Sequence, residues 1–257
     1  MVHVLGWLSH VERGFNSPTY SPDVAHWSKR FRYVRYDGRG AGLSDRGVED
    51  FSLDARTADL EAVIDGLGLE SPILLGLSAG GPTCIAFTAR HPEGVRALIL
   101  VSSAASGDAV RKANPVWNSL PEIMRSGWGQ DNAAARQVFT SLLAPEADPV
   151  VHGFINELIR VSMTGEDAGS FIASVMEGSV SDLLNQIRVP TLIIHASGDL
   201  LVPIEAGGRE LAAGIPGSRL VVLETNNHGI PSTDPQYPAL LETVDEFLAE
   251  VLEEPFR

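Results

Sequence analysis

The feature that most constrains the fold of this chain is an alternation of short apolar runs with longer segments of helical periodicity. Residues 73–75 and 97–101 are apolar at every position, which is typical of strands buried on both faces of a sheet. The pattern predicts an α/β fold, with a mostly parallel sheet and helices on both faces. Six strands are expected, at residues 2–6, 32–36, 72–77, 95–102, 189–195 and 219–223.

Helical periodicity fills most of the gaps between these runs. Ser52 is a suitable N-cap for a helix that carries Leu53, Leu60 and Ile64 on one apolar face. Further helices are predicted over residues 79–90, 203–214 and 237–252. Each follows a predicted strand, as expected for repeated βα units.

The alternation is interrupted once, between residues 107 and 187, where the pattern is helical and broken by prolines. A segment this long is too long for a loop, so we predict a helical cap (107–187) inserted into a core formed by residues 1–106 and 188–257. Four bulky apolar residues of this segment are candidates for the walls of a substrate pocket: Trp117, Met124, Trp128 and Phe139. The alternative is that they form the small core of the cap itself.

Charge and cysteine content exclude several classes of protein. The 257 residues include 33 acidic and 19 basic residues, a net charge of −14, which disfavours binding to nucleic acid or an anionic membrane surface. One cysteine, Cys84, rules out an internal disulfide framework or a thiolate metal cluster, and we interpret it as packed and inert. There is neither an apolar run long enough to span a bilayer nor a signal peptide pattern. We therefore expect a cytoplasmic protein.

The segment 76–80 has the pattern G-x-S-x-G between a predicted strand and a predicted helix. In this setting a serine occupies a tight strand-to-helix turn, and flanking glycines remove the Cβ atoms that would collide there. The hydroxyl of Ser78 would then project above the carboxyl edge of the sheet, at the positive end of the following helix.

A serine nucleophile needs a base, and the base needs a carboxylate to orient it. Asp199 and His228 follow the last two predicted strands, so loops at one edge of a parallel sheet would bring both to Ser78. His195 lies at the end of its own strand, where a structural role is expected.

With these residues the chain resembles the α/β-hydrolase family over nearly its whole length. The resemblance also rests on DGRGAGLSD at residues 37–45, RHPE at 90–93, and Gly-Asp followed by Val-Pro at 198–203. The opening GWLSHVE at residues 6–12 is similar to bacterial members associated with helix-turn-helix regulators and adenylate cyclases.

The resemblance implies a role for each site residue. Ser78 would be the nucleophile, His228 the base and Asp199 the orienting acid. The backbone N–H groups of Trp7 and Ala79 would form the oxyanion hole, although this chain has Leu-Gly where most members have His-Gly before that loop. No metal or organic cofactor is implied.

The neighbours of the oxyanion loop have more than one interpretation. His10 and Glu12 either contact substrate or stabilise the loop, and Asp37 and Arg39 are expected to brace their own loop.

A serine at this position forms an acyl-enzyme, which predicts hydrolysis of a carboxylic ester, lactone or thioester, as in carboxylesterases. The composition of the cap favours a small apolar substrate. One alternative is a ligand-sensing regulator with little turnover, and another is a cofactor-free acyltransferase or perhydrolase.

The family usually has eight strands, so the resemblance implies that the first two are missing here. Residues 32–36 would then form the sheet edge, an exposed position that could pair with a second copy in a homodimer.

Overall fold

A computed structural model describes residues 1–15, 17, 21–128 and 133–253. Residues 129–132 of the predicted cap lie outside the described residues. Within the described part, one sheet of six parallel strands has the order β2-β1-β3-β4-β5-β6. The strands are β1 Val2–Val4, β2 Val34–Arg35, β3 Ile73–Leu77, β4 Ala97–Val101, β5 Thr191–Ala196 and β6 Arg219–Leu223. All six predicted strands are confirmed, several of them shortened at their ends.

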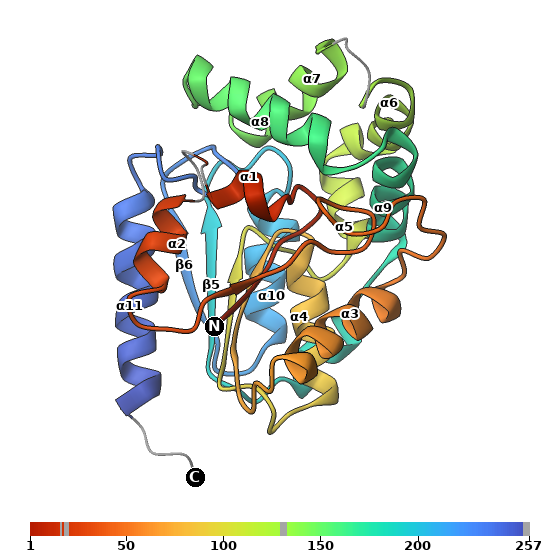
Figure 1. Cartoon of the computed structure of the whole chain (residues 1–257). Coiled ribbons are helices and arrows are strands. Elements are labelled where there is room, and N and C mark those ends of the chain that lie inside the picture. The colour runs from red at the N-terminus through yellow and green to blue at the C-terminus, as the bar shows by residue number, and fades with distance from the viewer. Residues whose placement is uncertain (16, 18–20, 129–132, 254–257) are drawn as a thin grey trace.

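Helices cover both faces of the sheet, as Figure 1 shows. One face packs against α3 (Leu53–Gly66), α4 (Gly80–Arg90) and α10 (Gly208–Gly214), and the other against α2 (Ser21–Trp27) and α11 (Tyr237–Glu253). An apolar cluster lies on each face, and every residue of the central strand β4 is buried. The unbroken apolar run of β4 predicted burial on both faces of the sheet, and the helices on the two faces provide it.

Local sequence chemistry sets where α3 begins. The hydroxyl of Ser52 accepts a hydrogen bond from the Ala55 N–H at 3.2 Å and so caps α3 as predicted. The helix predicted after Pro203 is divided instead, because a 3₁₀ turn at Ile204–Ala206 precedes α10.

Helices fill the segment between β4 and β5. They are α5 Gly107–Ala113, α6 Leu120–Gly127, α7 Ala134–Leu143, α8 Pro149–Ser162 and α9 Gly165–Glu177, with 3₁₀ turns at Pro115–Asn118 and Ser181–Gln186. Figure 1 shows α6, α7 and α8 above the carboxyl ends of the strands. An antiparallel bridge between Ser106 and Ser179 joins the two ends of the segment. The division into core and cap remains our interpretation of this arrangement.

The edge position predicted for residues 32–36 is confirmed, since among the described strands β2 pairs with β1 alone. Nothing in the structure tests the homodimer that this edge suggests. In the described part of the chain, no helix has both the length and the apolar character required to cross a membrane.

Candidate active site

Ser78 occupies a strained turn between β3 and α4. Its φ of 53° lies in the left-handed region that residues other than glycine rarely adopt. Neighbouring backbone holds it there, because the Ser78 N–H donates to the Val101 carbonyl at 2.9 Å and the Ser103 hydroxyl donates to the Ser78 carbonyl at 2.8 Å. This is the elbow that the sequence pattern predicted.

Two glycines allow the close packing around this turn. A Cβ atom on Gly76 would lie 2.8 Å from the Cα of Gly81, and one on Gly80 would lie 2.1 Å from the Val4 carbonyl oxygen. Helix α4 can therefore begin directly against β1 and β3 only because both positions lack a side chain.

Asp199 follows β5, His228 follows β6, and their side chains meet. The His228 Nδ1–H donates to Asp199 Oδ2 at 2.7 Å, while Asp199 Oδ1 accepts from the backbone N–H groups of Leu201 and Val202, each at 2.9 Å. Burial by itself raises the pKa of Asp199, but the His228 imidazole and these hydrogen bonds hold that pKa below its ordinary value. Asp199 is therefore an ionised acceptor in a fixed position, able to orient the imidazole.

His195 does not compete for this role. Its Nε2–H donates to the Val202 carbonyl at 2.8 Å and lies 3.7 Å from Asp199 Oδ2. The side chain is fully buried, and burial lowers its pKa. A neutral imidazole that bonds to its own loop fits the structural role expected for it. Among the residues described here, no group of three His, Cys, Asp or Glu side chains is arranged to hold a metal ion.

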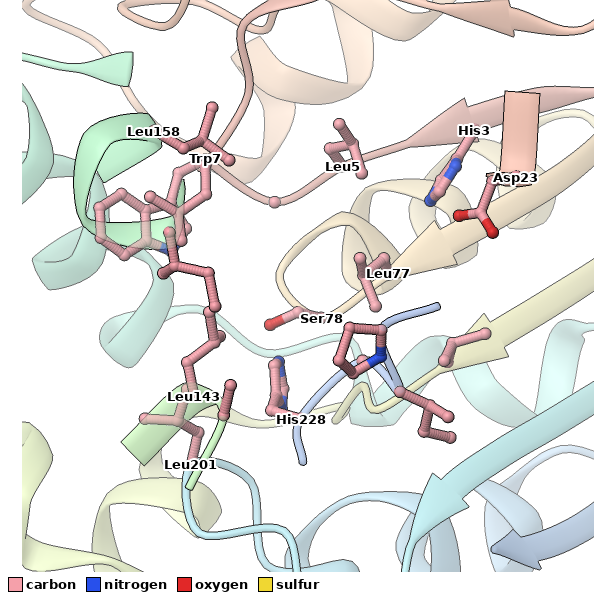
Figure 2. A pocket seen from close by; sticks show the side chains of 18 of the residues that line it. His3, Leu5, Trp7, Asp23, Leu77, Ser78, Leu143, Leu158, Leu201 and His228 are labelled. Atoms are coloured by element: carbon pink, nitrogen blue, oxygen red, sulfur yellow. The ribbon is translucent and has the colours of Figure 1, made fainter. Parts of the chain in front are cut away.

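Ser78 and His228 line the same pocket. Figure 2 shows the serine hydroxyl and the imidazole next to each other at its wall. The two side chains are not hydrogen-bonded to each other in the described structure, and in free enzymes such bonds are often long until substrate binds. The arrangement can place a reacting carbonyl between the hydroxyl and the base.

The loop that carries His228 is attached to the helices above it. The His228 N–H donates to the Leu143 carbonyl at 2.8 Å. Glu146 accepts from the Asn226 side-chain amide at 2.5 Å, and its own N–H donates to the Asn227 side-chain oxygen at 3.0 Å. No motif in the sequence indicated this connection, which depends on contacts about eighty residues apart.

The predicted oxyanion donors lie on adjacent segments. A Cβ atom on Gly6 would lie 3.5 Å from the Ala79 nitrogen, so the loop leading to Trp7 runs beside the start of α4. That helix has no side-chain N-cap bond. The Gly81 N–H donates to the Ser78 carbonyl at 3.0 Å, so the N–H that could meet an anion here is that of the N-cap residue, Ala79. Trp7, Ala79 and Ser78 also line one pocket together.

Two of the four residues predicted to contact substrate reach the pocket that Ser78 and His228 line. Trp117 and Phe139 line it, whereas Met124 and Trp128 do not line any of the three pockets described here. Both of these side chains are instead fully buried, and the Trp128 ring packs on Trp7 with ring centroids 4.8 Å apart. Met124 and Trp128 thus follow the alternative interpretation, in which they form the core of the cap segment.

The far end of the same pocket is polar, which the sequence analysis missed. His3 and Asp23 line it, and Figure 2 shows both on the side remote from Trp7. His3 Nδ1 is hydrogen-bonded to the Tyr33 hydroxyl at 2.6 Å, and the Tyr237 hydroxyl donates to Asp23 at 2.5 Å. Burial raises the pKa of Asp23 to about 6.

The loop formed by residues 37–45 is braced by its own polar side chains. The Asp37 carboxylate accepts backbone N–H bonds at 3.1 and 2.9 Å, and Arg39 pairs with Asp59 through two bonds of 2.7 and 2.8 Å. His10 is half-buried and Glu12 exposed; neither lines the pockets described here. These positions favour stabilisation of the loop over contact with substrate.

A further residue that sequence reasoning missed is Arg56 on α3. It is buried and lines two pockets beside Ala79. A signal was present, because Arg56 is a charged residue between Leu53 and Leu60 on the face expected to be apolar.

Comparison with known proteins gives a consistent result. A sequence profile described as the alpha/beta hydrolase fold matches residues 16–147. The AB hydrolase superfamily protein YisY of Bacillus subtilis is 33% identical over 208 residues, covering 77% of this chain and 75% of the relative. The bifunctional esterase/perhydrolase DCH of Acinetobacter calcoaceticus is 27% identical over 79% of this chain and 77% of its own. Among solved structures, an esterase from Exiguobacterium antarcticum superposes with a TM-score of 0.79 at 22% identity, covering 98% of this chain and 91% of its own.

Proposed function

Since the chain belongs to the α/β-hydrolase family, we propose that it hydrolyses a carboxylic ester, lactone or thioester through an acyl-enzyme on Ser78. The observation that carries this proposal is the pairing of a strained Ser78 with the Asp199-bound imidazole of His228 in one pocket. Serine attack on a carbonyl is the chemistry that such a pair performs.

The reaction would proceed in two halves. His228 takes the Ser78 proton as the hydroxyl attacks the carbonyl carbon, and the N–H groups of Ala79 and Trp7 stabilise the oxyanion. Each such donor contributes about 3 to 4 kcal/mol. His228 then protonates the leaving alcohol or thiol. A water molecule, deprotonated by the same imidazole, attacks the acyl carbonyl carbon, and the imidazolium returns the proton to the Ser78 oxygen as the acid leaves.

Asp199 supports this cycle by fixing the imidazole tautomer. Its Oδ2 holds the proton-bearing Nδ1 of His228, which leaves Nε2 as the acceptor for the serine proton. The same carboxylate stabilises the imidazolium that forms after proton transfer.

The pocket walls on both sides of Ser78 are apolar, which supports a substrate with an apolar portion. Trp117, Phe139 and Leu158 line the side near the cap helices, and Leu75 and Leu77 line the side along the sheet. An ester of moderate size can place its acyl and alcohol portions on the two sides of Ser78.

The test is turnover of p-nitrophenyl acetate and butyrate by purified protein, with Ser78→Ala as the inactive variant and exposed Ser126→Ala as the control. We expect Ser78→Ala to lose at least about 10³-fold in kcat. A wild-type protein without turnover on an ester and lactone panel would refute the hydrolase, and tight ligand binding by that protein would support the sensor instead. Peroxyacid formation from the same acyl donor and hydrogen peroxide would support the perhydrolase.

A further inference from the structure

Arg56 places a positive charge inside the apolar wall beside the nucleophile. The residue is 8% exposed, and it lines one pocket together with Ser78 and Ala79. The other residues of that pocket are mostly apolar or glycine, among them Trp7, Leu53 and Ile172, and Ser179 is a neutral polar member.

The contacts that Arg56 makes do not neutralise it. Its Nη1–H donates to the Ala79 carbonyl at 3.3 Å, and the guanidinium lies 5.2 Å from the centre of the Phe171 ring. Within the described residues its Nε is buried without a hydrogen-bond partner. The carboxylate one turn further along α3, Asp59, is bound by Arg39 on two oxygens.

This environment is unfavourable for a charge. Burial lowers the pKa of Arg56 to about 10, which still leaves it cationic at neutral pH. A buried charge is normally accompanied by an opposite charge that offsets its desolvation. A single neutral carbonyl at the long end of hydrogen-bond range does not provide one.

We propose that Arg56 binds a carboxylate carried by the substrate, so that the preferred ester, lactone or thioester has an acid group on an arm lying in this pocket. The proposal rests on the proposed hydrolase function and names its substrate class. A planar guanidinium fork matches a carboxylate in shape, and one guanidinium in apolar surroundings matches a single negative charge.

The position of Arg56 limits the length of that arm. Because Arg56 bonds to Ala79, the residue next to the nucleophile, an acid bound there lies a few methylene groups from a carbonyl at Ser78. The remainder of the arm would contact the apolar residues of the pocket. Arg56 is thus assigned to substrate selection rather than to the reaction itself.

The test compares two esters that differ only at the end of the acyl chain: p-nitrophenyl hexanoate, and the mono-p-nitrophenyl ester of adipic acid, which has a carboxylate in place of the terminal methyl. We expect the wild type to prefer the adipate ester in kcat/KM. In Arg56→Met, kcat/KM for the adipate ester should fall by about 10²-fold, mainly through KM, because the charge-assisted contact is lost. Hydrolysis of the hexanoate should change by less than about threefold.

Two further variants complete the design. Arg56→Lys keeps the charge without the fork and should retain part of the adipate preference. Arg209→Met removes an exposed arginine of α10 and should change neither substrate. Thermal unfolding of Arg56→Met should occur at the wild-type temperature or above it, since an uncompensated buried charge has been replaced by an apolar side chain.

Three results would overturn the inference. One is a wild type that prefers the hexanoate, and another is an equal loss on both esters in Arg56→Met. The third is a lower unfolding temperature for Arg56→Met, because it would show that Arg56 stabilises the fold through its bond to Ala79.

Failure of the hydrolase itself is recognised separately. If neither of these esters nor any member of the ester and lactone panel is hydrolysed, the proposed function fails, and calorimetric titration of Ser78→Ala protein with adipate still tests the site. Adipate should bind to Ser78→Ala, and the affinity should be lost in the Ser78→Ala, Arg56→Met double variant. Equal binding by both proteins, or by neither, would refute the carboxylate site.

Discussion

The Nδ1 nitrogen of His228 lies 2.7 Å from Oδ2 of Asp199, and the other oxygen of this carboxylate is held by two backbone N–H groups. The Asp199 carboxylate is thus held in place by the backbone, and it in turn holds the His228 imidazole in one orientation. In Asp199→Asn the side-chain amide can donate to Nδ1, which stabilises the wrong tautomer. We expect kcat to fall by about 10³- to 10⁴-fold.

The measurement is steady-state hydrolysis of p-nitrophenyl butyrate together with thermal unfolding. Asp182→Asn, at an exposed position, serves as the control and should behave like the wild type. Activity of a folded Asp199→Asn within tenfold of the wild type would remove Asp199 from the proposed role.

Gly80→Ala should destabilise the protein by about 3 kcal/mol or more, at or above the upper end of the range of about 1–3 kcal/mol that is usual when a tightly packed site is overfilled. The added Cβ would lie 2.1 Å from the Val4 carbonyl oxygen, and that oxygen belongs to the backbone and cannot move aside cheaply. Gly66→Ala is the matched control, because a Cβ there meets no atom within 4 Å, and the change should be neutral or stabilising by about 0.5–1 kcal/mol. Urea unfolding of both variants checks the contrast, and equal stabilities would contradict the packing described at the elbow.

Glu146→Ala should lower kcat by about threefold to tenfold and leave KM nearly unchanged, because small displacements of a catalytic group are costly. Glu146 contacts Asn226, two residues from His228, and binds Asn227 through its backbone N–H. The substitution removes the carboxylate contact and keeps the backbone bond. A rise in KM without a change in kcat would instead assign Glu146 to substrate binding.

Stability should depend on pH through Asp23. Its pKa of about 6 lies above the value of about 3.9 expected in the unfolded chain, so the folded state binds the proton more tightly. The contribution of Asp23 to stability is therefore present in full below about pH 4 and is lost as the pH rises through about 6.

Asp23→Asn should remove this component, so that the free energy of unfolding declines less between pH 4 and 7 than in the wild type. Chemical unfolding at several pH values measures the difference, with Asp182→Asn as the control. Parallel pH curves for wild type and Asp23→Asn would show that the carboxyl group does not titrate as described.

The sequence was sufficient for the sheet because each strand is marked locally. The run at residues 97–101 is apolar throughout and becomes the buried centre, and the short segment around Val34 becomes the edge. The positions of the three predicted site residues could also be predicted, because in a parallel sheet the ends of successive strands meet at one edge. This places Ser78, Asp199 and His228 together without any knowledge of the packing.

The lining of the pocket and the contacts around the site could not be predicted, because they depend on which elements pack together. Helical periodicity marks Trp117 and Trp128 alike as apolar, but only packing decides that Trp117 faces the pocket and Trp128 faces Trp7. The contact of Glu146 with Asn226 joins segments that are distant in the sequence. Arg56 was marked by its place on an apolar face, although the sequence does not show that Asp59 pairs with Arg39 instead.

The most direct test of the central claim is the site of modification by a fluorophosphonate, which phosphonylates an activated serine with loss of fluoride. The account predicts one label per chain, found by peptide mass spectrometry on the peptide that contains Ser78, retained in Ser126→Ala and absent from Ser78→Ala. Labelling of another residue, or none on a wild-type protein that hydrolyses p-nitrophenyl butyrate, would contradict Ser78 as the nucleophile.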